Sequence, residues 1–197
     1  MSKLTSREKG FIEYLENLVS NRDRGAIANL HRGLRKSPGT IPQMDRHVLK
    51  FLPEDIGERQ EELYYLVASL FALWHQGRDS TESAAGNLGR SLRVLVEQEG
   101  DPNRRDNIEK GIEKRLVALL NCHRDDLPEH LRQIISLLKS NEVSVDWAQL
   151  LSDIKYWDRD DRPVQKAWAR GFWIGSRQRE EKEATHAEIS SSETDED

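Results

Sequence analysis

The sequence has a single cysteine and no long run of hydrophobic residues. Because Cys122 has no second cysteine to pair with, an internal disulfide is excluded, which is typical of a reducing compartment. No apolar run approaches the roughly 18 residues that a membrane-spanning helix needs, and no signal-type hydrophobic region follows the first residue. We therefore expect a cytoplasmic protein with no membrane partner.

The chain also lacks the residue groups that hold metals or catalyse reactions. It has six histidines, but no two stand four residues apart, and Cys122 and His123 are neighbours, not part of a Cys-x-x-Cys pair. Asp158, Asp160 and Asp161 lie close together without the turn glycine and distal glutamate of a calcium loop. The sequence groups no nucleophile, base and orienting residue. We expect no metal, no cofactor and no enzymatic activity. Among enzymes, a helical nucleotide hydrolase is the alternative that stays open.

Charges are divided unevenly along the chain, although the formal net charge is only −5. Residues 177–197 hold eight acidic and three basic residues, which leaves 27 of each sign in residues 1–176. Residues 1–50 carry ten basic residues against five acidic ones. The acidic total therefore hides a neutral body with a basic beginning, as expected of a surface that faces an anion. The last segment has almost no large apolar groups, so we expect a disordered acidic tail there.

Residues 22–36 contain the most informative pattern. Wound as one helix, they have an apolar face made of Ala26, Ile27, Leu30 and Leu34. The opposite face is basic and has no acidic member; its residues are Arg24, His31, Arg32, Arg35 and Lys36. Arg22 and Arg24 would also stand at the helix start, where the macrodipole disfavours cations, so helix stability does not explain them. We predict that Arg24, Arg32, Arg35 and Lys36 bind phosphate groups.

Hydrophobic residues recur at helical spacing through most of the chain, and no stretch shows the convincing alternation of a strand. The predicted helices span residues 5–21, 22–36, 46–52, 58–76, 84–99, 108–120, 131–138, 146–157 and 163–172. Thr5 and Glu8 have capping-box spacing, while Asp146 and Pro163 suit helix starts. The helix at 58–76 is the most apolar, and we expect it at the centre of the first bundle. Most tryptophans fall on apolar faces, which favours core positions over base stacking.

A break at Gly100-Asp101-Pro102 interrupts the helical pattern, and we place a domain boundary there. The sequence therefore predicts an all-α protein with two small helical bundles, residues 1–100 and 101–176, followed by the tail at 177–197. Gly86 and Gly89 are not followed by the lysine and hydroxyl residue of a phosphate loop. We expect these glycines to allow close helix packing instead.

Three stretches resemble, in the same order, segments of a known family. They are Arg-Gly-Ala-Ile-Ala-Asn-Leu-His-Arg-Gly-Leu at 24–34, Asn-Leu-Gly-Arg-Ser-Leu at 87–92 and Val-Asp-Trp-Ala-Gln-Leu-Leu at 145–151. The residues at 125–132, 156–158 and 168–173 extend the match, which covers roughly residues 8 to 175. Each motif is short, but their order and spacing together make the chain similar to the CasB family. That family is the small subunit of Cascade, the type I-E CRISPR surveillance complex.

The resemblance implies two helical bundles, no catalysis, and a place in an antiviral RNA-guided complex. It implies crRNA, target DNA and displaced DNA as partners, together with the Cascade backbone subunits, the large subunit and a second copy of the chain. By position, it implies that several basic residues face nucleic acid: Arg32, Arg115, Arg124, Arg132, Arg159 and Arg162, with Arg59 matching less closely. Asn121 and Gln133 stand where some relatives have further bases. The acidic tail lies outside the match.

Two functions of different kinds follow from these observations. In the first, basic surfaces track phosphates without reading bases, and so stabilise the guide-target duplex and the displaced strand of the R-loop for any target. In the second, the chain is an assembly module whose basic patches contact acidic partner proteins. Nucleic-acid binding by the isolated chain at low salt discriminates between them.

Overall fold

The computed structural model describes residues 4–78, 84 and 86–174, and within these ranges the chain is helical with no strand. The all-α prediction is confirmed. The α-helices are α1 (Ser6–Ser20), α2 (Arg24–His31), α3 (Pro42–Val48), α4 (Glu58–His75), α5 (Leu88–Glu97), α6 (Pro102–Asn121), α7 (Leu127–Ser140) and α8 (Trp147–Lys155). Two 3-10 turns, η1 (Leu49–Phe51) and η2 (Arg124–Asp126), and a last helix described over residues 163–174 complete the fold. The predicted acidic tail lies outside the described residues.

Local capping explains where several helices begin. The Thr5 backbone N–H donates to Glu8 Oε2 (2.7 Å) while the Glu8 N–H donates to Thr5 Oγ1 (3.2 Å), which confirms the capping box. Asp146 accepts from the Gln149 N–H (2.8 Å) as the N-cap of α8. Pro163 is the first helical residue of the last helix, as predicted.

The predicted basic helix at 22–36 is shorter than expected, because α2 covers only Arg24–His31. Arg22 has a positive φ of 56° and precedes the helix, and the Asp23 carboxylate caps it by accepting from the Ala26 N–H (2.9 Å). The helix ends where Gly33 passes against Met44 and Ser69, since a Cβ on Gly33 would lie 2.2 Å from Met44 Sδ. From Gly33 to Lys36 the backbone turns tightly, with N–H groups bonded to carbonyls three residues back. The single basic face predicted for 22–36 is therefore wrong.

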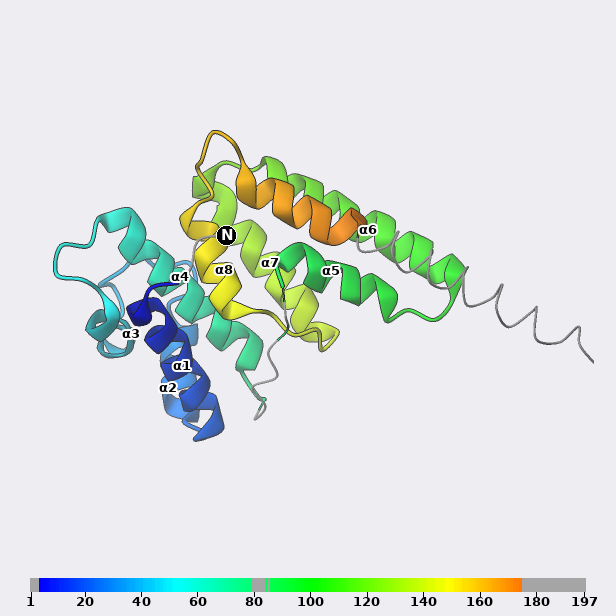
Figure 1. The fold of residues 1–197 in the computed structure, drawn as a ribbon. Coiled ribbons are helices and arrows are strands. Elements are labelled where there is room, and N and C mark those ends of the chain that lie inside the picture. The colour runs from blue at the N-terminus through cyan, green and yellow to red at the C-terminus, as the bar shows by residue number, and fades with distance from the viewer. Residues whose placement is uncertain (1–3, 79–83, 85, 175–197) are drawn as a thin grey trace, which may run out of the picture.

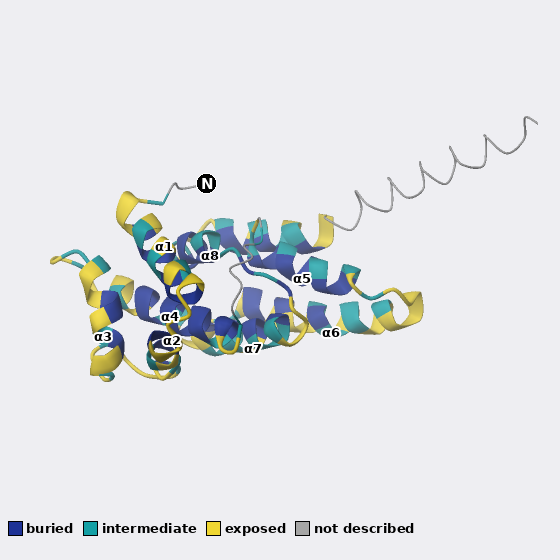
Figure 2. Ribbon diagram, turned by 90° about the horizontal axis from the view of Figure 1, so that it is seen from below, coloured by how far each residue is buried: buried dark blue, intermediate teal, exposed yellow. Residues whose placement is uncertain are grey.

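Helix α4, expected at the centre of the first bundle, lies at the centre of the whole molecule, in contact with α2 and also with α7 and α8. Figures 1 and 2 show α1, α2 and α3 at one end and α5 and α6 at the other, with α4, α7 and α8 between them. The Trp74 indole N–H on α4 donates to the Val143 carbonyl (3.0 Å), which joins α4 to the segment after α7. Buried residues from both sides of residue 100 form one hydrophobic core. The division into domains at residue 100 stays a prediction.

Close helix packing at Gly89 positions the last helix against α5. A Cβ on Gly89 would lie 1.9 Å from the Trp168 carbonyl oxygen, so only glycine permits this approach. This confirms the packing role predicted for Gly89. The prediction is wrong for Gly86, which precedes α5 with a φ of +115° that favours glycine, and where an added Cβ would meet only Arg90 side-chain atoms at 3.5–3.6 Å. Trp168 is fully buried, and its indole N–H donates to Asp153 Oδ2 (2.6 Å) on α8.

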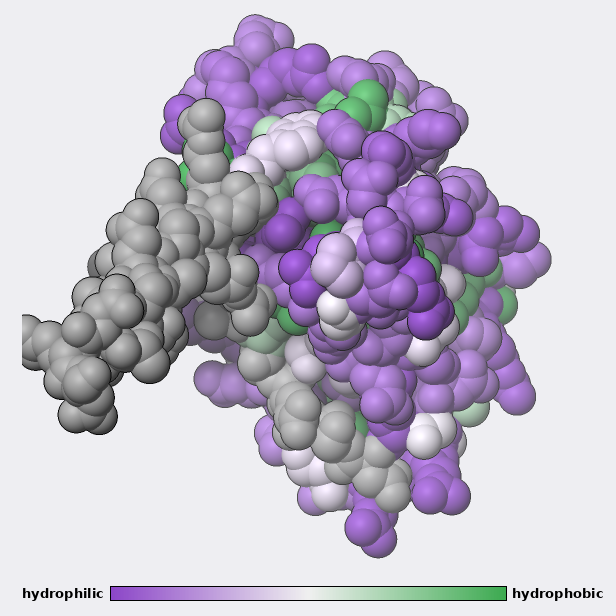
Figure 3. All heavy atoms as spheres, turned by 90° about the vertical axis from the view of Figure 1, so that its right-hand side faces the viewer, coloured by the Kyte–Doolittle hydropathy of each residue, from purple (hydrophilic) through white to green (hydrophobic). Residues whose placement is uncertain are grey.

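Few large hydrophobic side chains reach the surface of the described residues; they are Leu49, Val117, Trp173 and Ile174. The face drawn in Figure 3 is mostly hydrophilic, with hydrophobic residues in small separate areas. The buried positions of Trp74, Trp147, Trp157 and Trp168 match the predicted core role, but Trp173 is 38% exposed. Among the described residues, no helix is long and apolar enough to cross a membrane, and no group of three or more His, Cys, Asp or Glu is placed to hold a metal ion.

Candidate nucleic-acid interface

A groove of about 480 Å³ lies where the turn after α2, the first part of α4 and the η2–α7 junction meet. Its floor is apolar and includes Leu63 and Leu66 of α4 and Leu127 of α7. Half of the predicted phosphate-binding residues line it: Arg35, Lys36, Arg59, Arg124 and Arg132. Three acidic residues line it too, namely Glu62, Asp125 and Glu129. The groove therefore has a formal excess of two positive charges, and its basic residues come from distant parts of the chain.

At one side of the groove, two arginines share one carboxylate. Arg35 donates from Nε to Glu129 Oε2 (3.2 Å) and from Nη2 to both carboxylate oxygens (3.1 Å each). Arg132 donates from Nε to Oε2 (3.0 Å) and from Nη2 to Oε1 (2.5 Å), and Gln133 Nε2 adds a bond to Oε1 (3.1 Å). The bonds from Arg132 and then Gln133 lower the pKa of the Glu129 carboxyl to about 2. Glu129 is therefore ionised at neutral pH.

Arg124 has a supporting position in the groove. Only 17% of its side chain is exposed; Nη1 donates to Asp158 Oδ2 (2.8 Å) and Nη2 donates to the Arg59 carbonyl oxygen (3.4 Å). These bonds tie η2 to the loop after α8 and to the start of α4. Removing the Arg124 guanidinium would leave the Asp158 carboxylate without this partner, so its loss would disturb the fold as well as the charge.

Lys36 and Arg59 are the groove cations most available to a ligand. Both are exposed, and the structure describes no ion pair for either side chain. Arg32, the C-cap of α2, lies outside the groove lining and is also exposed. Its Nη1 makes one long hydrogen bond, to Asn29 Oδ1 at 3.5 Å. These three cations can therefore bind an external anion without first breaking an ion pair among the described residues.

Comparison with known proteins places the chain in a family. The family model for the CRISPR-associated protein Cse2 matches residues 26–173. A Cse2 protein from Thermus thermophilus is 31% identical over 174 residues, which cover 87% of this chain and 93% of that protein. The chain belongs to the Cse2 family.

Solved structures agree with this assignment. CasB from Thermus thermophilus is similar to this Cse2-family chain with a TM-score of 0.67 and 31% identity, over 86% of this chain and 99% of that one. A chain of a CRISPR RNA-guided surveillance complex is similar with a TM-score of 0.69 and 25% identity, over 87% and 96% of the two chains. The resemblance to the CasB family seen in the sequence is confirmed.

The other predicted residues of this Cse2-family chain lie outside the groove lining. Arg24 lines a smaller pocket of about 220 Å³ at the N-terminal end of α2, together with His75 and Arg78. Burial lowers the pKa of His75 to about 4, so this imidazole is neutral at pH 7 and adds no positive charge there.

Arg115 on α6 and Arg159 and Arg162 on the loop after α8 are exposed, and each side chain makes a described hydrogen bond, local for Arg115 and Arg159 and across 42 residues for Arg162. Arg115 Nη1 donates to the Gly111 carbonyl (3.1 Å), and Arg162 Nη2 donates to the Leu120 carbonyl. Arg159 pairs with Asp161 through Nε and Oδ1 at 2.9 Å. The structure therefore brings five of the ten predicted residues into one groove and leaves five beyond it.

Sequence reasoning missed the acidic members of this groove, above all Glu129. One signal was present, because Glu129 and Arg132 have the i,i+3 spacing at which helical side chains meet. The contact with Arg35 had no such signal, since the two residues are 94 positions apart. The face around Arg35 that looked free of acids in the sequence is therefore balanced by a carboxylate from α7.

Proposed function

We propose that this chain is the non-catalytic small subunit of Cascade, the type I-E CRISPR RNA-guided surveillance complex of antiviral defence. Membership of the Cse2 family supports this, as does the similar fold of a chain from a CRISPR RNA-guided surveillance complex. Its partners are then crRNA, the target and displaced DNA strands, the backbone and large subunits of Cascade, and a second copy of the chain.

One observation carries the nucleic-acid part of this proposal. The groove is lined by Arg35, Lys36 and Arg59 from the predicted first bundle and by Arg124 and Arg132 from the second. Because these residues share one groove, a single phosphate backbone lying in it would meet cations from both halves of the chain. Such an arrangement suits backbone tracking better than scattered patches would.

The proposed mechanism is sequence-independent binding that stabilises the R-loop. Arginine and lysine hold phosphate groups without reading bases, which suits a subunit that accepts every target. Formation of the guide-target duplex at the expense of DNA pairing is nearly balanced in free energy, so a few phosphate contacts suffice to favour the R-loop. In this proposal the groove holds one backbone, and the outlying bases extend the contact: Arg24, Arg32, Arg115, Arg159 and Arg162.

Binding by the isolated chain at low salt tests this function against the assembly role. We expect single-stranded and double-stranded DNA to bind at about 50 mM salt, with affinity falling steeply towards 200 mM because the release of condensed counterions gains less entropy at higher salt. Fluorescence anisotropy of labelled oligonucleotides of two unrelated sequences measures this. Equal affinity for both sequences supports backbone binding. A chain that binds neither nucleic acid at low salt, yet co-purifies with the other subunits, would instead be an assembly module.

A further inference from the structure

The groove of the free protein already contains an anion, the carboxylate of Glu129. Arg35 and Arg132 both present guanidinium forks to it, and Gln133 adds an amide N–H (3.1 Å). The Glu129 side chain nevertheless remains 42% exposed, so the cluster opens to solvent and is not a buried ion pair. A ligand can therefore approach these donors from outside.

The same donors suit a phosphate group. A guanidinium fork binds a carboxylate and a phosphate through the same paired N–H groups, and arginine is the preferred residue where such bidentate contact matters. Two forks and an amide that converge on one carboxylate therefore offer a phosphate group a ready set of hydrogen-bond donors. No other acidic side chain has a described bond to Arg35 or Arg132.

The backbone at Arg35 supports a role beyond ordinary surface solvation. Arg35 has a φ of 63°, in the left-handed region that disfavours residues with a Cβ. Sparsely populated backbone conformations are retained where the surroundings require them, and they concentrate at ligand-binding sites. Here the turn brings the Arg35 side chain to α7, where it meets Glu129 from a sequence distance of 94 residues.

We propose that Arg35, Arg132 and Gln133 form a phosphate-binding site that Glu129 occupies in the free protein, and that a nucleic-acid phosphate displaces Glu129 when the chain binds DNA or RNA. This inference rests on the proposed function, because it assigns the groove a nucleic-acid ligand. Glu129 lies in the first turn of α7, where the helix macrodipole favours a negative charge, so the displaced carboxylate keeps a favourable position. The internal carboxylate then weakens binding and aids release.

Neutralising Glu129 tests this exchange directly. We expect the full-length E129Q variant to bind a labelled single-stranded oligonucleotide about fivefold more tightly than the wild type, because an exposed ion pair no longer has to be broken. The matched control is E62Q, which removes the same charge from the same groove at an exposed residue with no described ion pair. The affinity of the E62Q control should rise by less than about twofold, since this substitution changes only the long-range electrostatic field, which salt screens.

The double variant R35Q/R132Q shows whether the gain comes from these two arginines. When E129Q is added to the R35Q/R132Q variant, it should improve the affinity for the oligonucleotide no more than E62Q improves that of the wild type. If wild type binds and E129Q gains no more than E62Q, or loses affinity, Glu129 does not occupy a phosphate site and the inference is wrong. If neither wild type nor E129Q binds at low salt, the proposed function fails instead.

The wild-type chain provides a measurement that does not depend on the folding of any variant. In NMR spectra, the Nε–H signals of Arg35 and Arg132 should shift when an oligonucleotide is added. The side-chain carboxyl carbon of Glu129 should move at the same time to the position of a solvent-exposed glutamate. Binding that leaves the Glu129 carboxyl signal unchanged would contradict the displacement.

Discussion

Replacing Arg32, Lys36 and Arg59 together with glutamine is expected to lower the affinity of the isolated chain for single-stranded DNA by about 10- to 100-fold at low salt. These three cations are exposed, and no ion pair is described for any of them. Each therefore releases counterions when it contacts a phosphate. The slope of log affinity against log salt should become shallower by about 2, because each phosphate contact on a single strand contributes about 0.7. Anisotropy titrations at several salt concentrations measure both quantities.

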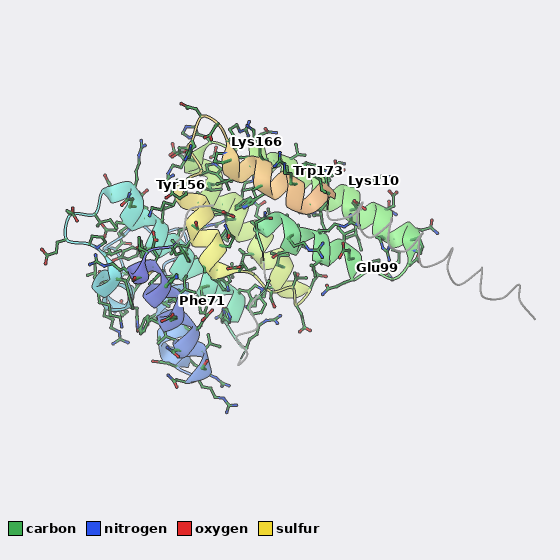
Figure 4. All side chains as sticks on the ribbon, viewed as in Figure 1. Phe71, Glu99, Lys110, Tyr156, Lys166 and Trp173 are labelled. Atoms are coloured by element: carbon green, nitrogen blue, oxygen red, sulfur yellow. The ribbon has the colours of Figure 1, made fainter. Side chains whose placement is uncertain are left out.

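A second triple variant controls for net charge. Replacing Lys9, Lys166 and Arg170 with glutamine removes the same charge from exposed residues that line none of the described pockets. Figure 4 shows Lys166 on the last helix, away from the blue helices at the N-terminal end of the chain. This control should change affinity by less than about threefold, through the long-range field alone. Equal losses in the two triple variants would mean that Arg32 and the groove cations Lys36 and Arg59 have no special role in binding.

Replacing Gly89 with alanine is expected to lower the free energy of unfolding by about 3 kcal/mol or more. The added Cβ would lie 1.9 Å from the Trp168 carbonyl oxygen and 2.9 Å from its Cα. Backbone atoms of a packed helix cannot move aside as the end of a flexible side chain can. The last helix must therefore shift away from α5, which also weakens the Trp168 bond to Asp153. Chemical denaturation followed by circular dichroism measures the loss.

Gly10 is the matched control for Gly89. It lies within α1, and a Cβ there would meet no atom within 4 Å apart from its chain neighbours and the adjoining backbone of α1. Alanine at this position should raise stability by about 0.5–1 kcal/mol, because glycine is a poor helix former. Opposite signs for the two substitutions would confirm that the effect at Gly89 comes from helix packing. A Gly89→Ala variant as stable as the wild type would show that α5 and the last helix do not approach this closely.

Much of the fold was predictable because local signals specify it. Apolar spacing identified the helices, the buried face of α4 included, and side-chain chemistry identified the caps at Thr5 and Asp146. The end of α2 was not predictable, because it depends on the close approach of Gly33 to Met44 and Ser69. Apolar and basic spacing continued past His31 although the helix did not.

The candidate site was predictable in its cations but not in its arrangement. Wheel geometry and the family resemblance together selected Arg35, Lys36, Arg59, Arg124 and Arg132, which the fold brings to one groove. No pattern in the sequence joins Arg35 to α7 or Arg124 to Asp158, because those contacts depend on how distant helices pack. For the same reason, the sequence did not separate exposed cations from those already held in ion pairs.

Retention of the R-loop by the assembled complex tests the central claim most directly. A surveillance complex built with the R32Q/K36Q/R59Q chain should release target DNA faster than one built with wild type, and the loss should be equal for unrelated target sequences. The loss should also be larger than with the K9Q/K166Q/R170Q control. Unchanged retention in a fully assembled complex would contradict the claim that this groove holds a nucleic-acid backbone.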